Sequence, residues 1–140
     1  MSMSLKANYG GLKLASPVVV GACAMTMQDP ARVAIQAAGA GAIVFPSLFE
    51  EQVIQWTKAN GRSITESEQR LLDRAGRTQA NWACPDAQSY LSMVNRATVT
   101  QSIPIIASLN GYTAGGWVDF AGELQEVGAA AIELNVHHSL

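Results

Sequence analysis

The feature of this sequence that most limits its possible folds is a helix-to-strand joint that occurs twice. The first copy is Gly39-Ala40-Gly41-Ala42-Ile43-Val44, and the second is Gly128-Ala129-Ala130-Ala131-Ile132-Glu133. In each copy the first glycine stands where a helix C-cap takes the left-handed conformation, and the small alanines let the helix return closely onto a sheet. Two copies of one joint predict a repeated β/α unit.

Strand-like and helix-like segments alternate along the chain, a pattern that forces parallel strands joined by crossover helices. Short apolar runs bounded by turn residues predict strands at 18–22, 42–47, 104–110 and 131–136. Apolar residues at helical spacing predict helices at 29–39, 48–58, 85–101 and 114–127. At the start of the first helix, Asp29 is expected at the N-cap and Pro30 at the first helical position.

Two segments fall outside this alternation. Residues 1–14 come before it and are predicted to form an N-terminal hairpin around Gly10-Gly11. Residues 60–83 are polar and irregular, apart from a short helix expected at 66–74. A connection of this length inside a compact domain is usually a lid, a binding loop or an insertion. We therefore interpret residues 1–140 as one partial barrel domain with a hairpin in front and a loop insertion in the middle.

The number of predicted strands sets the fold class. The chain has 140 residues, whereas a closed eight-stranded β/α barrel takes roughly 250. Four β/α units therefore predict the N-terminal half of a TIM-type (β/α)8 barrel. A doubly wound open sheet uses similar joints and stays open as an alternative, although no Gly-x-Gly-x-x-Gly follows the first strand.

Composition excludes several classes of partner. The chain is 49% hydrophobic and 14% charged, with a net charge of −2, and its nine Lys and Arg residues form no run. A nucleic-acid partner is therefore not expected. No uncharged apolar stretch reaches about 18 residues, so no membrane span is expected either, and the prediction is a cytoplasmic protein. The two cysteines, Cys23 and Cys84, suggest neither a metal site nor a disulfide framework.

Candidate site residues stand at the carboxyl ends of the predicted strands, where the active sites of parallel α/β proteins lie. Gly21 and Ala22 end the first strand, and Ser47, Asn110 and Asn135 end the other three. Asparagine amides both donate and accept hydrogen bonds, which suits the imide edge of a flavin or a pyrimidine. The alternative is that the two asparagines only close turns.

Four segments carry a resemblance to a known family: LKLASP at 12–17, AIVFPSLFEEQ at 42–52, PIIASLNG at 104–111 and ELNV at 133–136. They resemble the dihydroorotate dehydrogenase family, in particular its dihydroorotate dehydrogenase-like branch. The resemblance implies an FMN-binding β/α barrel, a flavoprotein oxidoreductase that oxidises dihydroorotate to orotate in pyrimidine biosynthesis.

The resemblance also implies roles for individual residues. Those implied to bind FMN are Gly21, Ala22, Ser47, Asn110 and Asn135, and those implied to bind a dihydroorotate-like substrate are Asn81 and Asn135. His138 falls where the family carries its Cys or Ser general base, and histidine is a competent base near neutral pH. Pro46 falls where the family carries a lysine near the flavin. No metal ligands are implied.

The phosphate of the cofactor in such barrels is held by loops after the seventh and eighth strands, which lie outside these 140 residues. The expectation is therefore an incomplete barrel that is inactive as this chain. Open strand edges would favour self-association. A second interpretation stays open, in which the chain is a nonenzymatic half-barrel remnant or an interaction module that has lost FMN chemistry.

Overall fold

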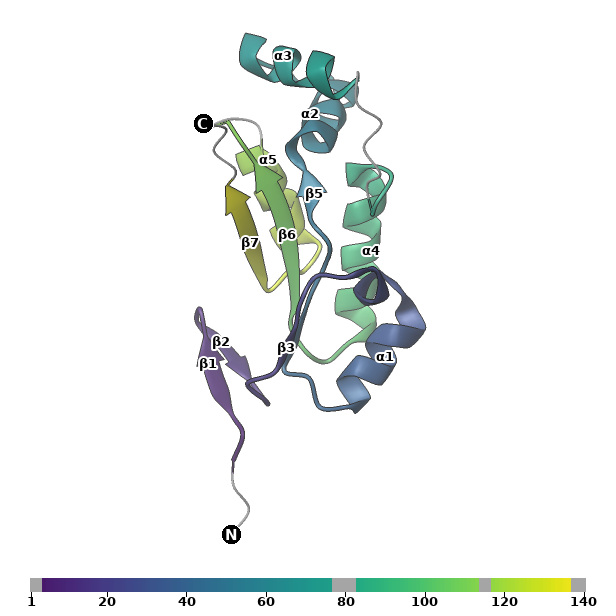
Figure 1. The fold of residues 1–140 in the computed structure, drawn as a ribbon, viewed down its shortest axis with the longest axis vertical. Coiled ribbons are helices and arrows are strands. Elements are labelled where there is room, and N and C mark those ends of the chain that lie inside the picture. Colours follow the sequence, from purple (N-terminus) through teal and green to yellow (C-terminus); the bar gives the residue numbers. More distant parts are fainter. Residues whose placement is uncertain (1–3, 77–82, 114–116, 137–140) are drawn as a thin grey trace.

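A computed structural model describes residues 4–76, 83–113 and 117–136 (Figure 1). Its main sheet is parallel, and its strands are β3 (Val19–Val20), β4 (Ala42–Val44), β5 (Leu48–Phe49), β6 (Ile105–Gly111) and β7 (Ala131–Val136). The strand β4 pairs with β3 on one side and with β6 on the other, and β7 pairs with the far edge of β6. The sheet thus grows in one direction along the chain.

This strand order decides between the two architectures left open by the sequence. A doubly wound sheet changes direction part-way along the chain, and its ligand crevice lies at that switch point. Among the described strands there is no such reversal, because each β/α unit adds its strand beside the one before it. The fold is an α/β fold with a parallel sheet of alternating β/α units, as in part of a (β/α) barrel. The predicted fold class is confirmed at that level.

Helices cover one face of the sheet (Figure 1). They are α1 (Asp29–Ala37), α2 (Glu50–Ala59), α4 (Ala87–Thr100) and α5 (Trp117–Glu126), with a short 3-10 helix, η1 (Ala24–Met27), before α1. A further helix, α3 (Glu66–Ala75), packs on α2 beyond the end of the sheet (Figure 1). The sheet residues in the core with them alternate along the strands and include Ile43, Phe45, Ile105, Ala107 and Leu109. This face is the outer one. None of the described helices has the length and apolarity needed to cross a membrane.

A hairpin covers part of the opposite, inner face. Its strands are β1 (Ala7–Tyr9) and β2 (Leu12–Leu14), which pair antiparallel through a turn at Gly10 and Gly11. Both glycines have positive φ, 54° and 86°, as a two-residue hairpin turn requires. Leu14 from the hairpin packs with the inward residues Ala42, Val44 and Ile106. The hairpin thus closes the amino-terminal end of the inner face.

The two glycine joints have the predicted geometry. Gly39 and Gly128 follow α1 and α5 with φ of 92° and 97°, so both take the left-handed conformation expected at a helix C-cap. The first joint also requires its second glycine, because a Cβ on Gly41 would lie 2.0 Å from the carbonyl oxygen of Ser16. Close contact between this joint and the end of the hairpin segment therefore depends on a missing side chain.

Three of the differences from the predicted boundaries have an evident local cause or affect the site. The first strand is limited to Val19 and Val20, so Gly21 and Ala22 already belong to the loop that follows. Asp29 is not the N-cap of α1; Gln28 is, and Asp29 is the first helical residue, with its carboxylate bonded to Arg32. Asp86, in contrast, caps α4 by accepting a hydrogen bond from the Ser89 amide at 2.7 Å.

The third difference lies in the second strand, which contains a bulge. Its register with β6 pairs Val44 with Ile106 but Leu48 with Leu109. Three residues, 45–47, therefore stand opposite two, 107–108. Pro46 lies inside the bulge. A proline suits this position because the extra residue of a bulge is left out of the strand pairing, so the missing N–H of proline costs no hydrogen bond between strands. Strand pairing resumes as β5, so Leu48 and Phe49 are strand residues and α2 begins only at Glu50.

Candidate functional site

Four polar side chains meet on the inner face of the sheet, near the carboxyl ends of its strands. The hydroxyl oxygens of Ser47 and Ser108 lie 2.8 Å apart, and Ser108 donates to Glu133 Oε1 at 2.8 Å. Asn135 Nδ2 lies 3.2 Å from each serine oxygen and 3.3 Å from Glu133 Oε1. We call Ser47, Ser108, Glu133 and Asn135 the mouth cluster. Three strands contribute to it, so it fixes these side chains relative to one another.

Regular strand geometry accounts for three of the four members. Ser108 stands opposite Glu133 in the parallel register, and Asn110 stands opposite Asn135. Side chains two residues apart on a strand share a face, so all four of these side chains lie on the inner face. Asn110 is therefore beside the mouth cluster, one step nearer the end of the sheet.

The bulge accounts for the fourth member, Ser47. Phe45 and Leu48 both pack in the core on the outer face, although they are three residues apart. Strict alternation would have placed Ser47 on the same face as Phe45. One extra residue shifts the alternation, and Ser47 reaches the Ser108 hydroxyl on the inner face instead.

A buried tyrosine satisfies the backbone of β6 opposite the bulge. The Tyr90 hydroxyl, from α4, accepts a hydrogen bond from the Ser108 amide at 3.0 Å and donates to the Ser108 carbonyl at 3.3 Å. Its ring packs edge-on against Phe45, with the centroids 6.2 Å apart. Burial raises the pKa of the Tyr90 hydroxyl well above its ordinary value, so the group stays a neutral donor and acceptor. Tyr90 thereby holds Ser108 in place from behind the sheet.

The loop after β6 is held by a buried carboxylate. Glu50, at the start of α2, is 1% exposed. Its Oε2 accepts hydrogen bonds from the amides of Tyr112 and Thr113, and its Oε1 accepts one from the Thr113 hydroxyl. This loop begins directly after Asn110 and Gly111. Glu50 therefore ties the start of one β/α unit to the loop of the next and fixes the rim of the site beside Asn110.

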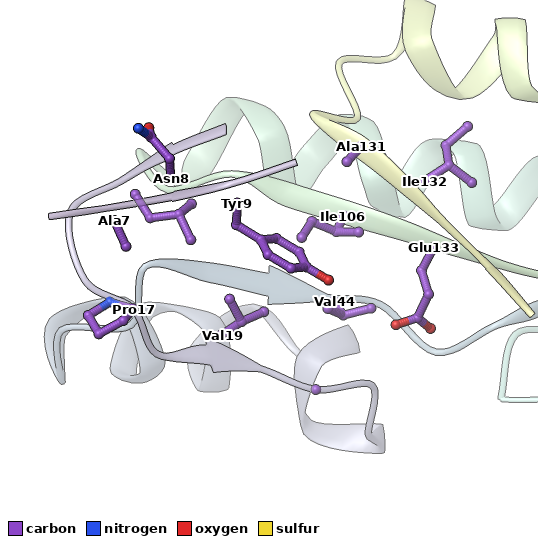
Figure 2. Close-up of a pocket in the computed structure, with 12 residues that line it drawn as sticks. Ala7, Asn8, Tyr9, Pro17, Val19, Val44, Ile106, Ala131, Ile132 and Glu133 are labelled. Atoms are coloured by element: carbon purple, nitrogen blue, oxygen red, sulfur yellow. The ribbon is translucent and has the colours of Figure 1, made fainter. Parts of the chain in front are cut away.

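A cavity of about 600 Å³ lies on the inner face between the hairpin and the sheet. Val44 and Ile106 lie on its sheet side, and Gly21 and Glu133 also line it. Figure 2 shows the Tyr9 ring and the Glu133 carboxylate directed into this space. Near the hairpin the cavity is lined mainly by apolar side chains, together with Asn8 and Tyr9, and Glu133 connects it to the mouth cluster.

Comparison with known proteins adds a sequence relationship to this geometry. No family model matches the chain. A segment of 54 residues is 39% identical to a protein of Aeropyrum pernix that is provisionally assigned as dihydroorotate dehydrogenase A (fumarate). The chain is partly homologous to dihydroorotate dehydrogenase. The match covers 39% of this chain and 18% of the relative, so it concerns the family and a short part of that protein.

Of the site residues expected from the resemblance to dihydroorotate dehydrogenase, the structure brings some together and leaves others apart. It brings Ser47 and Asn135 into hydrogen-bonding distance and places Asn110 beside Asn135 in the register. Gly21 lines the cavity, whereas its neighbour Ala22 is exposed and is not among the lining residues. Asn81 and His138 lie outside the described residues, so their roles as substrate-binding residue and base stay predictions.

Pro46, for which the resemblance implies the position of a family lysine, is buried in the bulge. No Lys or Arg side chain has a hydrogen bond to the mouth cluster among the contacts of the described residues, and Glu133 is the cluster's charged member. Nor do the described residues contain a group of three His, Cys, Asp or Glu side chains that could hold a metal ion. The polar character of the mouth thus comes from hydroxyl, amide and carboxylate groups.

Three residues of the site and its rim are not among those expected from the sequence: Glu50, Ser108 and Glu133. Glu50 falls in the first turn of the helix expected at 48–58, where acidic residues are common. Ser108 and Glu133 lie inside the expected strands, two residues before Asn110 and Asn135. Side chains two residues apart on a strand share a face, and this spacing is the signal in the sequence that points to them.

Proposed function

We propose that this chain forms one wall of an FMN site in an oxidoreductase of the dihydroorotate dehydrogenase type. The observation that carries the proposal is the mouth cluster, in which three neighbouring parallel strands bring hydroxyl, amide and carboxylate groups together. The partial homology to dihydroorotate dehydrogenase supports the same interpretation. Activity on dihydroorotate belongs to this proposal and rests on the resemblance.

The described residues fit the ring of a flavin better than its phosphate. Ser47, Asn110 and Asn135 offer hydrogen-bond donors and acceptors of the kind that an imide edge requires. A Cβ built on Gly21 would meet no atom within 4 Å, so a flat ring has space to approach the backbone there. The described residues that surround the mouth supply no cluster of cations for a phosphate. FMN, when bound, would supply the hydride acceptor of the reaction.

In this proposal the chain's own residues bind the substrate and move one proton. Oxidation of dihydroorotate to orotate removes a hydride from one carbon, and a base removes a proton from the neighbouring carbon. We assign substrate binding to Asn135 and Asn81, and the base role to His138, three residues beyond Asn135. Histidine titrates near neutral pH and can accept that proton.

Flavin binding is the direct test. The purified chain is examined for flavin absorbance and is then titrated into free FMN while the flavin fluorescence is measured. Quenching that saturates, and that is weakened by Asn135→Leu but not by the exposed control Asn95→Leu on α4, supports the proposal. Addition of dihydroorotate without oxygen then bleaches the flavin if the chain also turns over. Fluorescence that does not change at any protein concentration contradicts the FMN site in this chain.

A second candidate function is that of an interaction module, and the outward face of β7 favours it. Ile132, Leu134 and Val136 alternate along this strand and are 36%, 40% and 68% exposed. Apolar side chains on an open strand edge favour pairing with another chain. Mass measurement in solution at several concentrations tests self-association through this edge: a mass that rises with concentration, and that returns to the monomer value in Leu134→Lys, supports it. A constant monomer mass contradicts self-association.

A further inference from the structure

The hydrogen bonds of the mouth cluster have a single direction. A carboxylate only accepts, so the Ser108 hydroxyl donates its one proton to Glu133 Oε1, 2.8 Å away. Since that proton is used, the 2.8 Å contact between the two serines must have Ser47 as its donor. The Ser47 oxygen in turn accepts from Asn135 Nδ2 at 3.2 Å. The chain of donors therefore ends at Glu133.

This direction decides the orientation of the Asn135 amide. Its Nδ2 has acceptor oxygens on Ser47, Ser108 and Glu133 within 3.2–3.3 Å. If the amide were turned over, its carbonyl oxygen would face the Glu133 carboxylate and the two serine hydroxyls. It could be paired only by turning the Ser47 proton away from Ser108, which breaks the bond between the two serines, and it would be repelled by the carboxylate oxygen. Nδ2 therefore faces the cluster, and Oδ1 is the amide atom that can accept a hydrogen bond from a ligand.

We propose that Glu133 is a positioning residue that holds the Asn135 amide with its carbonyl oxygen toward the ligand. This role rests on the proposed function. The edge of the ligand that faces Asn135 Oδ1 must then present an N–H donor, as the imide of a flavin or a pyrimidine does. A ligand edge that carries only acceptors is rejected, because it would leave Oδ1 unpaired.

Glu133 suits a test of this role because it is exposed on the inner face. An exposed hydrogen-bonded carboxylate contributes little to folding stability, so its replacement changes the cluster and leaves the fold intact. Glu133→Leu removes the acceptor at similar size. Glu133→Gln keeps one acceptor oxygen without the charge and serves as the rescue variant. Glu126→Leu, at an exposed position near the end of α5, is the control.

The first measurement needs no ligand. The rate at which the Asn135 side-chain amide protons exchange with water is measured by NMR on the whole chain, with Asn135→Asp identifying the signals. We expect exchange about tenfold faster in Glu133→Leu, the effect of losing one charge-assisted hydrogen bond. Exchange in Glu133→Gln lies nearer the parent value, and Glu126→Leu has no effect. Equal rates in the parent and in Glu133→Leu overturn the proposal, and Ser108→Ala, which breaks the same chain, decides the question if Glu133→Leu does not fold.

The second measurement tests the ligand edge with FMN and with 3-methyl-FMN, whose imide nitrogen cannot donate. The parent chain is expected to bind FMN about tenfold more tightly than the methylated form, the effect of one unpaired buried acceptor, and Glu133→Leu is expected to lose this preference. A preference that persists in Glu133→Leu, or that is absent in the parent, overturns the assignment of the imide edge. If the parent binds neither flavin, the proposed function fails, while the exchange rates still decide whether Glu133 orients Asn135.

Discussion

The inner face of the sheet has two halves that differ in chemistry and in cover. Near the amino ends of the strands it is apolar, and the hairpin packs on it through Leu14, which is 3% exposed. Near the carboxyl ends it carries the mouth cluster, whose carboxylate, Glu133, is exposed. The same three strands run through both halves. Stability is therefore concentrated at one end of this face and polar recognition at the other.

From this difference we expect substitutions near the amino ends of the strands to affect folding and substitutions on the inner face near the carboxyl ends to affect binding. In parallel α/β folds the carboxyl ends carry chemistry, while the opposite end serves stability. Here the division passes along single strands, between Val44 and Ser47 in one and between Ile106 and Ser108 in the next. Gly41→Ala and Gly21→Ala test this division directly, while Glu50→Gln and Tyr90→Phe test the buried groups that hold the carboxyl end from outside the inner face. The four are ordered by their expected effect on the free energy of unfolding.

Gly41→Ala should have the largest effect. Its new Cβ would stand 2.0 Å from the Ser16 carbonyl oxygen, a backbone atom that cannot move aside alone. We expect the free energy of unfolding in urea to fall by about 3 kcal/mol, the upper range for an overpacked buried position. An unchanged urea midpoint would show that the hairpin segment is not packed closely on this joint.

Glu50→Gln should have the next largest effect. The glutamine carbonyl oxygen can still accept from the Tyr112 and Thr113 amides, and its NH2 group can donate to the Thr113 hydroxyl, but the negative charge that strengthens these buried hydrogen bonds is lost. We expect a loss of about 2 kcal/mol, typical of hydrogen bonds to a charged group. Hydrogen exchange of the Tyr112 and Thr113 amides should quicken. Glu126→Gln, at an exposed site, is the control, and equal exchange in both variants would contradict the role of Glu50.

Tyr90→Phe removes the two hydrogen bonds to the Ser108 backbone and should cost about 1 kcal/mol in urea unfolding. It should also change the response to alkaline pH. Because burial raises the pKa of Tyr90 in the folded state, its contribution is complete below the ordinary tyrosine pKa of about 10 and is lost as the pH rises toward the folded value. The phenylalanine variant should lose less stability above that pH. Tyr9→Phe, on an exposed ring, should leave the alkaline loss as it is.

Gly21→Ala should have the smallest effect on folding, within about 0.5 kcal/mol, because its Cβ would meet no atom within 4 Å. Under the proposed function it should weaken FMN binding, since the methyl group occupies space beside the ring. A urea midpoint equal to the parent, together with a raised FMN dissociation constant, would support the division of the inner face. A large loss of stability would instead place Gly21 with Gly41 among the structural glycines.

Much of the fold could be predicted because its determinants are local. The left-handed glycines at 39 and 128, the alternation of strands and helices, and the shared face of residues 133 and 135 each depend on a few neighbouring residues. The strand predicted at 131–136 matches β7. The helix predicted to begin at Leu48 begins at Glu50, so this boundary was wrong by two residues. Phe49 stands at helical spacing from Val53, but the structure pairs Leu48 and Phe49 with β6 as strand β5.

The sequence by itself determined the repeated β/α unit, the parallel direction of the strands and the polar residues at their carboxyl ends. Tertiary structure alone decided that a bulge turns Ser47 to the inner face, that Tyr90 bonds the Ser108 backbone and that Glu50 holds the loop after β6. The Ser47 and Glu50 contacts join residues 61 to 63 positions apart. Periodicity records only which face a side chain takes within its own strand or helix, so partners this distant, and a one-residue shift in register, become visible only when the strands are placed side by side.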